Sequence, residues 1–315
     1  MNTGLKITAF AAALAAAFGT AYGVGGSLDP VVADRAPAHD ERHAPPSTEA
    51  DGHAGHGTPP AGGLQISESG YRLDLRTPRV TAGHRTELRF AVRDDHGRAV
   101  TEYRREHDKE LHLIVASRDL LTYRHLHPTR AADGTWTTPV DLPRAGGYRV
   151  FADFTPAAEG ARDLTLGADL AASGPYRPQE LPRAVGTARV DGYEVELAGA
   201  LRPGRASGLS LSVSRGGKPV TDLQPYLGAY GHLVALRAGD LAYLHVHPTG
   251  APGDGRTGPG PAVSFTATAP SSGDYRLFLD FKHDGVVRTA AFTVHAGAAE
   301  EAAPPAPEHS DGHGH

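Results

Sequence analysis

Short segments in which apolar and polar residues alternate dominate the middle of the chain. The segments "YRLDLR" (71–76), "TELRFAV" (86–92), "YEVELAG" (193–199) and "LSLSVSR" (209–215) carry apolar residues at every second position. Glycine, proline and aspartate separate them. A period of two bounded by turn residues is typical of half-buried β-strands. The pattern therefore predicts an all-β fold of short strands.

The β-rich region contains a sequence duplication. Residues 97–129, "GRAVTEYRREHDKELHLIVASRDLLTYRHLHPT", align with residues 217–249 without a gap, and "LPRAGGYRVFADF" (142–154) aligns with "APSSGDYRLFLDF" (269–281). Each unit of roughly 100 residues offers about seven strands, as in an immunoglobulin-like β-sandwich. We therefore predict two tandem immunoglobulin-like β-sandwich domains, over residues 64–178 and 179–296.

The two ends of the chain differ in composition from the middle. Residues 1–26 contain an uncharged run, "ITAFAAALAAAFGTAYGVGG", which predicts a hydrophobic helix serving as a signal peptide or an uncleaved signal anchor. Residues 27–63 and 297–315 are rich in Pro, Ala, Gly and charged residues, which predicts a disordered tether and a disordered tail. The protein is therefore expected outside the cytoplasm, either anchored to the membrane by its N-terminal segment or secreted.

The composition excludes several kinds of partner and metal site. With 31 Lys and Arg against 36 Asp and Glu, no basic field indicates nucleic acid. The chain has no cysteine, and its one methionine is Met1, which excludes iron–sulfur clusters, thiolate zinc sites and blue copper. Its 18 histidines leave imidazole, with carboxylates, as the available metal ligands. Such ligands suit Cu(II) or Zn(II), with Cu(II) favoured by the affinity order alone.

One histidine-containing phrase occurs in both copies, as "YRHLHPT" (123–129) and "YLHVHPT" (243–249). A hairpin turning at Arg118–Asp119 would place His112 opposite His125, with His127 on the same face if the loop is even, and the second copy repeats this with His232 and His245. Imidazoles about 5–7 Å apart at Cβ can converge on one ion. The predicted metal ligands are His112, His125 and His127 in the first copy and His232, His245 and His247 in the second.

Other residues are weaker candidates for contributing to a metal site. A carboxylate that orients an imidazole is predicted from Asp153, Asp280 or Glu110, while a fourth ligand position open to water is an equal alternative. Histidines with Asp, Glu and Gly in the tether and the tail predict weak, exchangeable metal binding. These are His39, His43, His53, His56, His309, His313 and His315.

Two tyrosines and a tryptophan are expected to be structural. Tyr148 and Tyr275 follow a glycine at the start of a late strand in each copy, where a hydroxyl–backbone bond of the tyrosine-corner kind is expected. Trp136 is expected in the core.

The segments "HLIVASRDLLTYRHLHPT" and "LPRAGGYRVFADF" resemble those of exported, membrane-anchored proteins of high-GC Gram-positive bacteria, built from one or two immunoglobulin-like sandwiches. This resemblance covers roughly residues 64–295, and it extends loosely to small extracytoplasmic copper-handling β-sandwiches of the CopC and YtkA type. Those families bind metal through a few histidines and a carboxylate. The resemblance implies that His112, His125, His127 and their second-copy counterparts are ligands.

Three functions are compatible with these patterns. The first is a non-enzymatic, extracytoplasmic protein that captures or delivers copper or zinc, with a membrane metal transporter as a possible partner. The second is a structural or adhesive cell-surface module whose histidines form internal hydrogen bonds. The third is a hydrolase or hydratase using zinc-bound water, which no nucleophile–base phrase supports.

Overall fold

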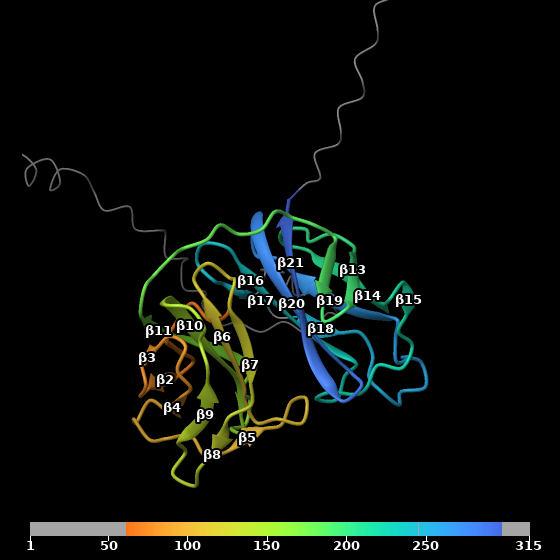
Figure 1. The fold of residues 1–315 in the computed structure, drawn as a ribbon. Helices are drawn as coiled ribbons and strands as arrows, with labels where there is room; N and C mark the ends of the chain where they lie inside the picture. Colours follow the sequence, from red (N-terminus) through yellow and green to blue (C-terminus); the bar gives the residue numbers. More distant parts are fainter. Residues whose placement is uncertain (1–60, 245, 298–315) are drawn as a thin grey trace, which may run out of the picture. The chain divides into compact units, whose positions relative to one another are not determined.

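The computed structural model describes residues 61–244 and 246–297 of the chain (Figure 1). All described residues belong to one compact unit. The predicted N-terminal hydrophobic segment and the histidines of the tether and tail lie outside the described residues. In the described part of the chain, no helix is long and apolar enough to cross a membrane.

The described residues form an all-β fold of immunoglobulin-like β-sandwich repeats, as predicted. In the first repeat, one sheet has the order β1-β2-β4-β9-β8 and the other the order β3-β11-β10-β6-β7, with β5 paired to β10. Its strands are β1 (Ser67–Glu68), β2 (Tyr71–Leu75), β3 (Arg79–Thr81), β4 (Thr86–Arg93), β5 (Tyr103–Arg104), β6 (His112–Ser117), β7 (Tyr123–Leu126), β8 (Thr129–Arg130), β9 (Trp136–Val140), β10 (Gly146–Pro156) and β11 (Leu164–Ser173).

The second repeat has the same two-sheet arrangement. One sheet has the order β12-β13-β14-β19-β18, with β15 paired to β14, and the other the order β17-β16-β20-β21. Its strands are β12 (Thr187–Val190), β13 (Tyr193–Ala198), β14 (Ala206–Arg215), β15 (Lys218–Pro219), β16 (Gly231–Arg237), β17 (Tyr243–Leu244), β18 (Val246–Pro248), β19 (Ala262–Thr268), β20 (Gly273–His283) and β21 (Val286–Ala296).

Each repeat has its own hydrophobic core, built from the inward positions of both of its sheets. In the first repeat Phe90 and Trp136 of one sheet share a core with Val115 and Val150 of the other. Trp136 is buried, as predicted. Because successive strand residues face opposite sides, the alternate positions of β6 and β10 are left for another contact.

Those alternate positions form a third apolar cluster, which joins the two repeats and is called the interface cluster below. It contains Ile114, Ala116, Leu120, Tyr123 and Phe151 of the first repeat and Val234, Leu236, Leu241, Tyr243 and Phe278 of the second. Burial on both faces explains why "HLIVAS" and "HLVAL" are continuous apolar runs without polar alternation.

Equivalent residues of the two repeats make matching contacts in the interface cluster. Tyr123 stacks on Phe278, with ring centroids 4.1 Å apart and planes 7° apart. The repeat-equivalent pair, Tyr243 and Phe151, has centroids 5.7 Å apart. Each repeat therefore presents the same kind of face to the other.

Backbone and side-chain hydrogen bonds fix two further features. The Tyr148 hydroxyl donates to the Arg144 carbonyl oxygen at 2.7 Å, and Tyr275 donates to Ser271 O at 2.9 Å, which confirms the predicted tyrosine-corner role. Gly62, which we predicted to belong to the disordered tether, exchanges two backbone hydrogen bonds with Tyr243. Ordered structure therefore begins earlier than the composition indicated.

Candidate metal site

The three first-copy histidines lie on the hairpin of β6 and β7, on the face that meets the second repeat. The predicted register of this hairpin is wrong by two residues: Ile114, not His112, pairs with His125, and extending the register by one residue places His112 opposite His127. The turn is centred on Asp119–Leu120, where Leu120 adopts a left-handed φ of 57°. The loop is nevertheless even, so all three histidines share one face, as predicted.

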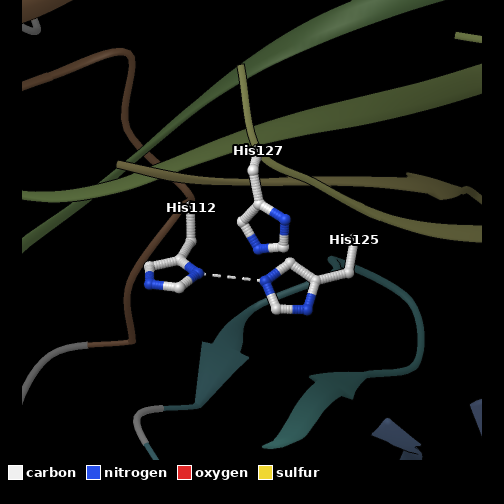
Figure 2. A group of neighbouring side chains, drawn as sticks. All are labelled: His112, His125 and His127. Carbon is white, nitrogen blue, oxygen red and sulfur yellow. Dashed lines mark hydrogen bonds between the residues drawn. The ribbon is translucent and has the colours of Figure 1, made fainter. Parts of the chain in front are cut away.

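The three imidazoles converge (Figure 2). One ring nitrogen from each of His112, His125 and His127 lies within 4.8 Å of the other two. Their ring centroids are 5.3 Å (112–125), 5.5 Å (112–127) and 4.8 Å (125–127) apart. An ion that bound imidazoles tetrahedrally at about 2.05 Å would hold their centroids roughly 5.2 Å apart. The spacing of the rings therefore fits a tetrahedral ligand set, for which nitrogens now up to 4.8 Å apart must turn to about 3.3 Å.

Hydrogen bonds on the outer side of two rings determine which nitrogens carry protons. His112 Nε2 lies 3.2 Å from the Glu106 carbonyl oxygen, which can only accept, so Nε2 must donate. His125 Nδ1 lies 2.9 Å from Asp280 Oδ2 and donates to that carboxylate. In the neutral rings, His112 Nδ1 and His125 Nε2 are therefore both unprotonated.

These two unprotonated nitrogens face each other at 3.1 Å. Two lone pairs at that distance repel unless a cation lies between them, either a shared proton or a metal ion. Burial and the neighbouring His125 lower the pKa of His112 to about 3, which disfavours the proton on that ring. An oriented imidazole with its outer N–H on a carboxylate or carbonyl is the usual state of a metal-ligating histidine.

His127 completes the group with a nitrogen that has no partner. Its Nε2 is buried and forms no hydrogen bond with the described residues, and Figure 2 shows its ring beside the other two. Burial lowers the pKa of His127 to about 3, so the ring is neutral near pH 7. A buried, unpaired nitrogen is costly unless a ligand satisfies it, and metal coordination would do so.

A fourth imidazole approaches this trio from the second repeat. His232, at the start of β16, has its ring centroid 6.4 Å from that of His112 and 6.2 Å from that of His125. Its Nε2 donates to the Tyr226 carbonyl oxygen at 2.8 Å. Burial lowers the pKa of His232 to about 4. A cavity of about 100 Å³ is lined by His112, His125 and His232, and also by His107.

The three predicted carboxylates occupy different environments. Asp280 of the second repeat orients His125 of the first, and it also accepts a hydrogen bond from Thr289 Oγ1. Asp153, its repeat equivalent, is half-buried and accepts from Thr165 Oγ1 at 2.7 Å, and desolvation raises its pKa to about 6. Glu110 forms an ion pair with Arg130 at 3.1 Å.

The predicted second trio is only partly visible. His232 is described, whereas His245 lies outside the described residues and the side chain of His247 is not described. The backbone of His247 belongs to β18, which pairs with β19 in the other sheet of the repeat. A set made of these three residues remains a prediction.

Three contacts of the site could not be predicted from the sequence, although two of the residues that make them were candidates. The pairing of His125 with Asp280 joins residues 155 positions apart across two repeats. The orienting group of His112 is a backbone oxygen, which any residue type at position 106 would supply. The approach of His232 to the first trio depends on how the repeats pack. The only available signal was that Asp280 and His232 stand at duplicated positions.

The chain matches the family model described as "Domain of unknown function (DUF8832)" over residues 66–165 and 188–298. The chain belongs to this family. No curated protein matches it.

Several solved structures are similar to the chain at low identity. They include the Escherichia coli adhesin FdeC, with 17% identity and a TM-score of 0.23, over 73% of this chain and 65% of that one. InvD of Yersinia pseudotuberculosis has 13% identity and a TM-score of 0.23, over 76% of this chain and 62% of that one. Invasin, a bacterial integrin-binding protein, has 12% identity and a TM-score of 0.21, over 72% of this chain and 39% of that one. The chain therefore matches less than two thirds of the length of these structures.

Proposed function

We propose that this member of the DUF8832 family is a non-enzymatic metal-binding protein that holds one divalent ion on His112 Nδ1, His125 Nε2 and His127 Nε2. The near-tetrahedral spacing of the rings favours Zn(II) over Cu(II), because Cu(II) prefers tetragonal geometry. This choice differs from the order that composition alone favours.

One observation carries the proposal: two imidazole nitrogens, each left unprotonated by a hydrogen bond on the far side of its ring, face each other at 3.1 Å. A third buried nitrogen without a partner lies beside them. All three groups are satisfied together by one cation, whereas a shared proton satisfies only two.

The proposal extends to a biological setting that the sequence indicates. An exported protein with histidine-containing tails could collect Zn(II) or Cu(II) weakly on the tails and hold it more tightly at the trio. The likeness to CopC and YtkA proteins is consistent with this use, and a membrane metal transporter is the expected partner. Placement outside the cytoplasm is part of the proposal.

The test is a thermal unfolding series on the full chain, with and without Zn(II) and a chelator. A ligand that binds only the folded state at 100 times its Kd stabilises it by about 2.7 kcal/mol. We expect Zn(II) to raise the Tm of the wild-type chain and not that of the His125→Ala/His127→Ala variant. Equal shifts in both chains would place binding at another site of the folded chain and contradict the proposal, since binding to disordered tails persists on unfolding and shifts neither Tm.

A second function is supported by the buried pair of His125 and Asp280, whose side chains are 7% and 3% exposed. If His125 is an imidazolium, it donates to Asp280 through Nδ1 and to His112 through Nε2, and the site holds the two repeats together without metal. The protein would then be a structural or adhesive surface module. In that case a chelator leaves the Tm unchanged, and the His125→Ala/His127→Ala variant is less stable with or without metal.

A further inference from the structure

The trio provides three of the four directions of a tetrahedral ion. Their centroids are spaced as three vertices of a tetrahedral set would be, and the fourth vertex belongs either to water or to another protein ligand. Among the described residues, the further imidazole that closely approaches two members of the trio is His232, at 6.2 and 6.4 Å between centroids.

His232 is oriented by the same kind of hydrogen bond to a backbone carbonyl as His112. His112 Nε2 donates to the carbonyl oxygen of residue 106, and His232 Nε2 donates to that of residue 226, which is the equivalent position in the second copy. Each bond leaves Nδ1 unprotonated and able to bind a metal. The side chain of His232 is buried and lines the same cavity as His112 and His125.

We propose that His232 is the fourth ligand, so that a single ion is held by three histidines of the first repeat and one of the second. This inference rests on the proposed function. A tetrahedral four-histidine site needs centroids roughly 5.2 Å apart, so the His232 ring must move about 1 Å toward His112 and His125. The ion then joins the two repeats at the edge of the interface cluster, beside the contact of His125 with Asp280.

The assignment also separates His232 from the second-copy trio suggested by the sequence. A ring that binds the first-copy ion through Nδ1 and the Tyr226 carbonyl through Nε2 has no nitrogen left for another ion. The protein should therefore bind one ion tightly at the interface, and binding should depend on residues of both repeats.

The experiment compares full-length chains by Zn(II) affinity, measured in competition with a chelator, and by the visible spectrum of bound Co(II). We expect His232→Ala to weaken Zn(II) binding at least tenfold and to change the Co(II) spectrum, since water replaces an imidazole. His232→Gln keeps an amide donor for the Tyr226 carbonyl and should lose affinity equally, which separates ligation from folding. His96→Ala is the control, because His96 is exposed, lies beside Asp95 and does not line this cavity.

Three outcomes would overturn the inference. In the first, both His232 variants keep the wild-type affinity and Co(II) spectrum while His125→Ala/His127→Ala abolishes binding, which leaves the proposed function intact with water as the fourth ligand. In the second, the His232 variants lose a separate second ion, which assigns His232 to its own copy. In the third, the wild-type chain binds no ion beyond its tails, and the proposed function fails as well.

Discussion

The Asp280→Asn variant tests how the second repeat supports the metal site. Asp280 Oδ2 lies 2.9 Å from His125 Nδ1, and the opposite nitrogen of that ring is the proposed ligand. Asparagine keeps an oxygen that can accept a hydrogen bond from Nδ1–H, but it lacks the negative charge. Loss of such an orienting carboxylate typically lowers metal affinity 10–100-fold, or about 1.4–2.8 kcal/mol.

A Coulomb estimate from the structure sets an upper bound. The path from the carboxylate through the ring to the ion is roughly 7 Å, for which an effective dielectric constant of 20 gives about 4.7 kcal/mol for a doubly charged ion; sharing of the charge with the imidazole ligands lowers the effect toward the 10–100-fold range. We expect Zn(II) affinity, measured by chelator competition, to fall within the 10–100-fold range. Without metal, the free energy of unfolding should change little, since the asparagine oxygen still accepts from a neutral His125.

Asp153→Asn is the matched control, because Asp153 stands at the equivalent position and bonds to Thr165. It should lower affinity for the interface ion less than Asp280→Asn does, because Asp153 lines the same cavity but its hydrogen bond goes to Thr165 and not to a ligand imidazole. The reasoning is refuted if Asp280→Asn binds Zn(II) like the wild type. It is also refuted if the metal-free variant loses about 3–5 kcal/mol of stability, which is the cost expected for breaking a buried ion pair. Such a loss would mean that His125 and Asp280 form an ion pair, with a proton on His125 Nε2 in the position proposed for the metal.

Two further predictions concern stability without metal. Tyr148→Phe and Tyr275→Phe should each lower the free energy of urea unfolding by about 1 kcal/mol, the net value of one hydrogen bond, and an unchanged midpoint would contradict the tyrosine-corner role. The lowered pKa values of His112 and His232 mean that the unfolded chain binds more protons than the folded chain below about pH 6.5. Stability should therefore fall as pH falls from about 6.5 to 4, by up to about 1.4 kcal/mol per pH unit for each histidine. Asp153, whose pKa is raised to about 6, has the opposite effect, because between about pH 4 and 6 the folded chain binds one more proton at this carboxyl group than the unfolded chain does. A stability that rises overall on acidification would contradict the prediction.

Features of the fold that depend on short stretches of sequence could be predicted. Alternation predicted strands, and the duplication predicted two sandwiches with equivalent hairpins. The face shared by His112, His125 and His127 followed from strand periodicity and an even loop. The register did not follow, because Leu120 takes a left-handed conformation in the turn, and a leucine gives no signal of that.

The composition of the site could be predicted only in part, since it depends on packing between distant segments. Asp280 was a candidate to orient an imidazole, but strand alternation cannot show that its partner is His125 of the other repeat. His107 is exposed and also lines the same cavity, which no local pattern in the sequence indicates. His283 is bonded to Tyr193 and Asp222, so a structural role accounts for it.

The central claim is that one ion lies among the three first-copy imidazoles, and a crystal of the full chain grown with Zn(II) tests it directly. Anomalous difference density measured at the zinc edge should show a peak about 2 Å from His112 Nδ1, His125 Nε2 and His127 Nε2. Density confined to other histidines, with the His112 and His125 nitrogens still in contact with each other, would contradict it.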